Sequence, residues 1–126
     1  MKKNFWMWAV LGVVIFAAIV YALNRGPDAP GEYDAFAQCL TAAGVKMYGA
    51  DWCPHCAEQK KLFGNSWKYV DYVECDARGD NADPEACDAA GVEGFPTWIF
   101  SDGTKIAGQT SLRQLSVKTN CALEAA

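Results

Sequence analysis

The chain has few basic side chains and a single histidine. Its 126 residues include 11 lysines and arginines against 15 aspartates and glutamates, a net charge of -4. The basic residues form no stripe of the kind that binds phosphate backbones, which argues against a nucleic-acid partner. Motifs for nucleotide, flavin or haem are also missing, as are internal repeats and low-complexity tracts. Any chemistry must therefore come from the chain's own side chains.

Cysteine, by contrast, is abundant. All six cysteines follow residue 38, in a segment of about 100 residues that is near the usual size of one domain. This density is typical of an oxidising compartment and is harder to explain in a cytosol.

The N-terminus carries a long apolar run. No charged residue interrupts the sequence from Phe5 to Leu23, and at about 1.5 Å per helical residue this run covers most of a hydrocarbon core of about 30 Å. Lys2 and Lys3 precede it, so we expect a membrane anchor over 1–24 with a cytoplasmic N-terminus. A cleaved signal peptide is the alternative, although signal h-regions span only about 7–15 residues. Either way, the rest of the chain lies outside the cytoplasm.

Residues 25–32, rich in proline and glycine, predict a linker to a globular domain over 33–126. In that domain we expect helices over 31–44, 53–64, 83–91 and 111–120, and strands over 45–50, 68–75, 96–100 and 104–109. Strands joined through helices are parallel neighbours, and the last two strands form a hairpin across "SDG". The fold class is therefore α/β, a mixed sheet of about four strands with helices on both faces.

The stretch "GADWCPHCAEQ" places two cysteines at the point where a strand leads into a helix. Cys53 begins the helix, where unpaired N–H groups and the positive end of the macrodipole stabilise a thiolate. Cys56 lies one turn deeper on the same face and is shielded from solvent. This asymmetry predicts one attacking thiol and one resolving thiol.

Zinc is the main alternative for a Cys-x-x-Cys pair. A structural zinc site needs four ligands, and the other cysteines form no second Cys-x-x-Cys pair while His55 is the sole histidine. We therefore expect neither a metal nor any other cofactor, and the redox centre is the Cys53–Cys56 disulfide itself.

The motifs "MYGADWCPHCAEQKKLFG", "YVEC" and "GVEGFPTWIFSDGTKIAGQTSL" resemble the thioredoxin fold. They are similar above all to the thioredoxin-like domain associated with bacterial vitamin K epoxide reductase homologues, over about residues 33–121. The resemblance implies that Cys53 is the nucleophile, Cys56 the resolving thiol and Pro96 a cis-proline. The Phe95–Pro96 bond would then present backbone polar groups to an incoming peptide. An ordinary strand-entry proline is the alternative for Pro96.

One position departs from the family pattern. Many thioredoxins place a buried aspartate six residues before the nucleophile, where it assists proton transfer from the resolving thiol, but this chain has Met47 there. A water molecule, Glu74 or Lys46 could take over that function.

The remaining site residues flank the dithiol and the proline. The resemblance makes Trp52 a surface platform for substrate, although an aromatic side chain at this position could also cap the core. Pro54, Phe95 and Thr97 complete the expected substrate-binding set. His55 is expected to hydrogen-bond the Cys53 thiolate, or else to be a solvated helix residue.

The other four cysteines admit three pairings. Cys75 ends a strand and Cys87 lies early in the next helix, so we expect them to be joined at one end of the sheet. Cys39 would then pair with Cys121. Their helices are expected on opposite sheet faces, so the tail after residue 120 would have to wrap around an edge.

The expected function is that of a membrane-tethered, extracytoplasmic thiol-disulfide oxidoreductase. The resemblance implies that it oxidises protein thiols and passes electrons to a membrane-embedded, quinone-linked enzyme of the vitamin K epoxide reductase type. A reductase or isomerase fed by a reducing carrier, a Cys-x-x-Cys metal carrier and a redox-inert interaction module are the alternatives.

Overall fold

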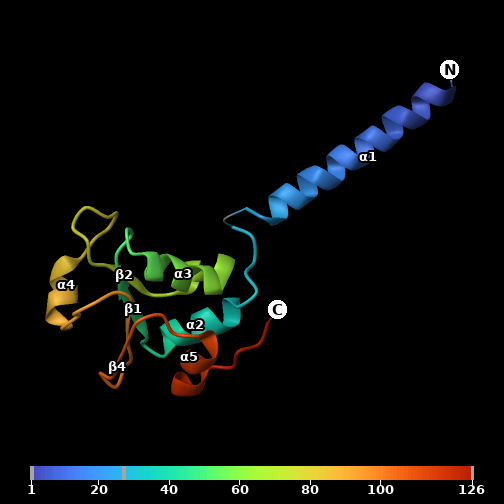
Figure 1. Cartoon of the computed structure of the whole chain (residues 1–126). Coiled ribbons are helices and arrows are strands. Elements are labelled where there is room, and N and C mark those ends of the chain that lie inside the picture. Colours follow the sequence, from blue (N-terminus) through green and yellow to red (C-terminus); the bar gives the residue numbers. More distant parts are fainter. Residues whose placement is uncertain (1, 27, 126) are drawn as a thin grey trace. The chain divides into compact units, whose positions relative to one another are not determined.

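The structure is a computed structural model that describes residues 2–26 and 28–125. It contains two compact units, the first ending at Pro30 and the second spanning Gly31–Ala126 (Figure 1). The predicted linker at 25–32 straddles this boundary. Each unit is described by itself below.

The first unit is formed by helix α1 (Lys2–Asn24). Within it, the stretch Asn4–Asn24 is long and apolar enough to cross a membrane, and none of this stretch is buried by other parts of the chain. Signal sequences near an N-terminus share these properties. The helix is therefore compatible both with the predicted membrane anchor and with a cleaved signal peptide.

The second unit contains a four-stranded mixed sheet in the order β2-β1-β3-β4. Strand β1 (Lys46–Gly49) pairs in parallel with β2 (Tyr72–Glu74) and antiparallel with β3 (Thr97–Ile99), and β4 (Lys105–Ala107) pairs antiparallel with β3. The helices are α2 (Asp34–Ala42), α3 (Pro54–Phe63), α4 (Pro84–Ala89) and α5 (Leu112–Thr119). The predicted α/β class, strand number and element order are confirmed, and the architecture is that of a thioredoxin-like fold.

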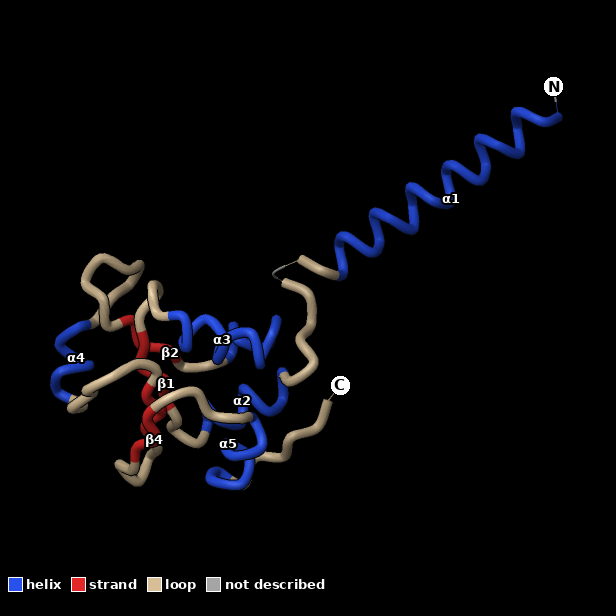
Figure 2. The backbone as a smooth tube through the Cα atoms, in the orientation of Figure 1, coloured by secondary structure: helices blue, strands red, loops and turns tan. Residues whose placement is uncertain are grey.

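Helices cover both faces of the sheet, but unequally. Figure 2 shows α2, α3 and α5 on one side of the strands and α4 on the other. Phe36 of α2 stacks on Phe63 of α3 at 6.1 Å between ring centroids, and Phe63 lies 6.0 Å from Trp98 of β3. Leu115 of α5 belongs to the same buried cluster.

This arrangement corrects one expectation. The helices of Cys39 and Cys121 were expected on opposite faces, but α2 and α5 lie on the same face (Figure 2). The Cys39–Cys121 disulfide therefore needs no tail wrapped around a sheet edge. The second disulfide joins Cys75, just after β2, to Cys87 in α4.

A second correction concerns residues 64–75. The predicted strand over 68–75 is only Tyr72–Glu74, and a 3-10 helix, η1 (Gly64–Tyr69), occupies the preceding segment. Trp67 of η1 packs against Phe63 and Tyr72, at 5.8 Å and 5.6 Å between ring centroids. The alternation of residues in this segment predicts a strand, but the segment instead forms a 3-10 helix that packs an aromatic side chain against the core.

Candidate active site

The backbone of the Cys-x-x-Cys segment turns from strand to helix within a few residues. Strand β1 ends at Gly49, and the Cys53 N–H donates to the Ala50 carbonyl at 3.0 Å. Cys53 is the N-cap of α3, and its sulfur accepts a hydrogen bond from the Cys56 N–H at 3.3 Å. Pro54 occupies the first helical position, where a missing N–H is harmless. A backbone donor of the first turn is thus directed at the Cys53 sulfur.

The two sulfurs lie in different surroundings. Both are free thiols and both are largely buried, at 5% exposure for Cys53 and 1% for Cys56. The Cys53 thiol donates to the Phe95 carbonyl, with 3.7 Å between sulfur and oxygen. Burial, and then the hydrogen bond to Cys53, raise the pKa of Cys56 to about 12. Cys56 is therefore a protonated thiol at neutral pH.

The segment before β3 forms the other wall of the site. The Phe95–Pro96 peptide bond is cis, and Pro96 is buried while the Phe95 side chain is partly exposed. The Trp52 indole packs edge-on against the Phe95 ring, with 6.1 Å between centroids, and is 62% exposed. Residues far apart in the chain, 52–53 and 95–96, therefore meet at one place.

Three other predicted site residues take different positions. Pro54 and His55 are exposed on the first turn of α3. Thr97 is buried at 4% exposure, and its hydroxyl donates to the Gly94 carbonyl at 2.7 Å. The Thr97 side chain is therefore buried and hydrogen-bonded within its own segment.

Two side chains of β2 lie behind Cys56. Tyr72 donates a hydrogen bond from its hydroxyl to Glu74 Oε2 at 2.7 Å, and Glu74 is 4% exposed. Burial, and then this hydrogen bond, raise the pKa of Tyr72. Lys60 of α3 lies over the Tyr72 ring at 4.1 Å and pairs with Asp51 at 3.4 Å. The sequence analysis named Glu74 as one of three candidates to assist proton transfer from Cys56, but it did not identify Tyr72. Tyr72 could have been inferred from Glu74, because residues two apart on a strand lie on the same face of the sheet.

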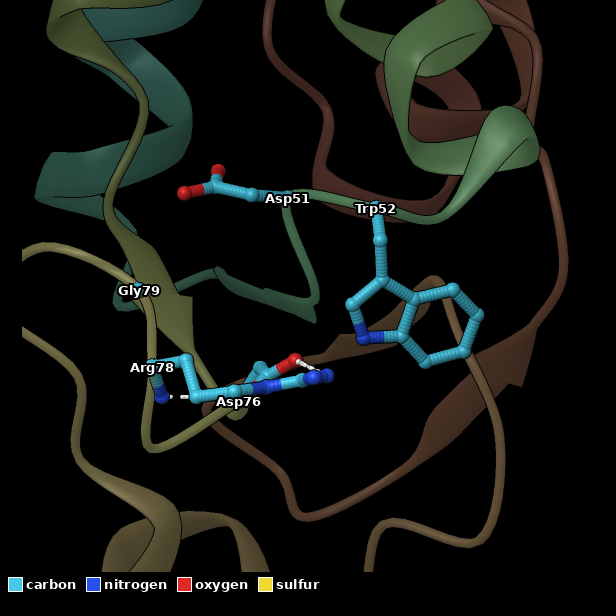
Figure 3. A pocket seen from close by; sticks show the side chains of 5 residues that line it. All are labelled: Asp51, Trp52, Asp76, Arg78 and Gly79. Carbon is cyan, nitrogen blue, oxygen red and sulfur yellow. Dashed lines mark hydrogen bonds and ion pairs between the residues drawn. The ribbon is translucent and has the colours of Figure 1, made fainter.

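A hollow of about 340 Å³ opens beside Trp52. Its lining residues are Asp51, Trp52, Asp76, Arg78 and Gly79, and Trp52 points into it toward the Asp76–Arg78 pair (Figure 3). Arg78 donates from Nε and Nη2 to the two Asp76 oxygens at 2.9 Å and 2.6 Å. These hydrogen bonds lower the pKa of Asp76. In the sequence, only its place after a strand points to this pair.

Residues 2–26 and 28–125 contain no group of three or more histidine, cysteine, aspartate or glutamate side chains that could hold a metal ion. The chemistry that the described arrangement offers is that of two thiols in one helical turn. Such a pair can exchange between dithiol and disulfide.

Comparison with known proteins supports this chemistry. No protein-family model matches the sequence. Over 96 residues the chain is 43% identical to the thiol-disulfide oxidoreductase LTO1 of Arabidopsis thaliana, an alignment that covers 73% of this chain and 25% of that protein. The chain therefore spans about a quarter of the length of the curated relative that it matches.

Proposed function

We propose that this protein is a thiol-disulfide oxidoreductase that uses Cys53 and Cys56 as its redox centre. The carrying observation is the position of Cys53, at the N-cap of α3 and beside the Phe95 carbonyl, with Cys56 in the same turn. The name of the Arabidopsis relative supports the same chemistry.

In the oxidising direction, a substrate thiolate attacks the Cys53 sulfur of the Cys53–Cys56 disulfide. A substrate–Cys53 disulfide forms, the bond to Cys56 breaks, and Cys56 leaves with the electron pair and takes up a proton. A second substrate thiolate then attacks the substrate sulfur of the mixed disulfide, so that the substrate gains a disulfide and Cys53 leaves as a thiolate. Two electrons pass from substrate to protein, and a partner must remove them.

The proposed substrates are extracytoplasmic protein thiols, and the proposed electron acceptor is a membrane-embedded, quinone-linked enzyme of the vitamin K epoxide reductase type. Helix α1 supports membrane tethering, and the two disulfides away from the Cys-x-x-Cys pair support an oxidising compartment. The motif resemblance supports the partner. The exposed Trp52 ring and the hollow beside it offer a surface where substrate polypeptide docks next to Cys53.

The direction of electron flow is tested by the reduction potential of the Cys53–Cys56 couple, measured against glutathione. Thioredoxin has a potential of about -270 mV and the oxidase DsbA about -120 mV. The dipeptide between the cysteines is Pro-His, and a histidine beside the thiolate stabilises the reduced form, so we expect a potential clearly above thioredoxin's. A value at or below about -270 mV would replace the oxidase by a reductase or isomerase.

A further inference from the structure

The buried thiol of Cys56 raises a question about protons that the two cysteines alone do not answer. Thiol-disulfide exchange requires Cys56 as a thiolate when it attacks, and returns it as a thiolate when it is displaced. Cys56 is 1% exposed, so solvent has little access to its sulfur. The side chains around Cys56 are therefore the candidates for carrying its proton.

The neighbours on the β2 side are Tyr72 and Glu74. Gly49 separates them from Cys56: a Cβ atom on this glycine would lie 2.9 Å from the Cys56 sulfur and 3.4 Å from the Tyr72 hydroxyl oxygen. The sulfur and the hydroxyl thus border one small space that only a glycine leaves open. On its other side, the same hydroxyl donates to the Glu74 carboxylate at 2.7 Å.

We propose that Tyr72 and Glu74 form a proton relay for Cys56, in which the Tyr72 hydroxyl exchanges a proton with the Cys56 sulfur and Glu74 stores it. The inference rests on the proposed function and adds a proton path to it. Glu74 acts through Tyr72 and is a positioning and proton-storing residue. Lys46, the other side chain considered for this function, pairs with Asp71 at 3.6 Å at the opposite end of β1.

The proposed relay conserves the proton and the electron pair in both directions of the reaction. When Cys56 resolves a mixed disulfide, its proton passes to Tyr72 as the Tyr72 proton passes to the Glu74 carboxylate. The Cys56 thiolate then forms a bond to Cys53, and the substrate sulfur leaves Cys53 with the electron pair. When a substrate thiolate displaces Cys56 from the disulfide, the same proton returns to the Cys56 sulfur.

Other charged groups face this relay and set its electrostatic surroundings. Cys53 lies in the same turn as Cys56, Lys60 of α3 covers the Tyr72 ring, and Asp51 pairs with Lys60. Glu74 also accepts a hydrogen bond from the Asp76 N–H at 2.8 Å, so its carboxylate has a structural contact with the loop after β2 in addition to the one with Tyr72. A test must separate the proton path from this structural contact.

The test uses the full-length chain in detergent, fully reduced, with oxidised glutathione as the probe. Rapid quenching and mass spectrometry follow first the glutathione adduct on Cys53 and then its conversion to the Cys53–Cys56 disulfide. Glu74→Gln is expected to slow the second step about 100-fold at neutral pH, the lower end of general acid-base effects. Its rate should then rise about tenfold per pH unit, because hydroxide becomes the proton acceptor. Adduct formation, measured with Cys56→Ser present, should stay within about twofold.

Tyr72→Phe provides the second variant, because it removes the hydroxyl and leaves the contact between Glu74 and Asp76 in place. It should slow resolution as Glu74→Gln does, and the double variant should be no slower than the slower single variant, since both residues serve one path. Glu58→Gln is the matched control, because this glutamate is exposed and pairs with Lys61 on the surface of α3.

An unchanged rate and pH profile in both Glu74→Gln and Tyr72→Phe would overturn the relay. An equal slowing of adduct formation and resolution would overturn it too, because that pattern indicates a distorted site. Failure of the proposed function looks different: the wild-type chain would form no adduct on Cys53 at all.

Discussion

At the scale of single residues, the site depends on the unequal surroundings of two cysteines. Cys53 receives a backbone N–H from its own helix and donates to a carbonyl from the loop before β3. Cys56 is enclosed by the core, where burial disfavours its charged form. The two sulfurs thus lie within one helical turn and are both buried, but the Cys56 thiol has a raised pKa.

This asymmetry predicts the order of alkylation. At a pH below its pKa of about 12, the Cys56 thiol stays mostly protonated and reacts slowly. Its reactivity increases as the pH rises toward that value. Iodoacetamide at mildly acidic to neutral pH should therefore label Cys53 first, as mapped by mass spectrometry of the reduced chain. Cys56→Ser should trap mixed disulfides on Cys53. Preferential labelling of Cys56 would reverse the two roles.

The side chain of His55 is predicted to tune the potential. It lies on the exposed first turn of α3, two residues after the Cys53 N-cap, where a hydrogen bond or positive charge stabilises a thiolate. His55→Ala should lower the potential by about 30 mV or more, equivalent to about 1.4 kcal/mol. Lys61→Ala, which removes an exposed cation farther along α3, is the control. Equal potentials for wild type and His55→Ala would show that the histidine is merely a solvated helix residue.

At the scale of elements, α3 is held against the sheet by one buried amide. Gln59 is fully buried and donates from Nε2 to the Thr110 carbonyl at 2.9 Å. Its Oε1 accepts the Thr110 N–H at 2.7 Å and the Trp98 indole N–H at 3.3 Å. This side chain ties the active-site helix to β3 and to the chain that leads into α5.

Gln59→Leu should therefore destabilise the fold. The substitution leaves the polar groups of Thr110 and Trp98 buried without their partner, and each such group costs about 1–3 kcal/mol. We expect a loss of about 3 kcal/mol or more in unfolding free energy, measured by denaturant titration. Gln38→Leu, at an exposed position of α2, is the matched control. A loss below about 1 kcal/mol would contradict the bridging role.

The disulfide between β2 and α4 yields a separate prediction. It closes a loop with a sequence separation of 12, for which the chain-entropy estimate is about 3 kcal/mol. Replacing Cys75 and Cys87 by serine should lower the unfolding free energy by about this amount and leave turnover of a glutathione-based substrate largely intact. Lost turnover with unchanged stability would instead mean that the pair relays electrons.

The sequence predicts those elements whose signals are local. Pro54 and Pro84 at first helical positions and the Ser111 cap place the starts of α3, α4 and α5 correctly. The strand-to-helix position of Cys53 likewise follows from "MYGADWC" and the proline after it.

What the sequence does not predict depends on packing between distant segments. The 3-10 helix at Gly64–Tyr69 replaces a strand because Trp67 packs on Phe63 and Tyr72. The placement of α2 on the same face as α5 follows from the stacking of Phe36 on Phe63, which no periodicity encodes. The closeness of Tyr72 to Cys56 depends on the absence of a side chain at Gly49, which becomes informative only when β1 and β2 are paired.

At the scale of the whole molecule, an apolar helix is joined to a unit with its own core. Helix α1 exposes large apolar side chains along its length, including Trp6, Phe16 and Leu23. Such a surface is costly in water and favourable in a hydrocarbon core. The unit Gly31–Ala126 carries the dithiol and both other disulfides.

The last prediction concerns the location of this unit. Because Lys2 and Lys3 precede the apolar run, the positive-inside rule predicts a cytoplasmic N-terminus and a C-terminal unit outside the cytoplasm. After expression in a bacterium, fractionation should leave the full-length chain in membranes, and protease added to spheroplasts should degrade the C-terminal unit. Exchanging the two lysines for glutamates should reduce that accessibility, because orientation follows the positive charges. A soluble form that starts near Leu23 would instead identify the apolar run as a cleaved signal peptide, and protection of the unit in wild-type spheroplasts would contradict the predicted orientation.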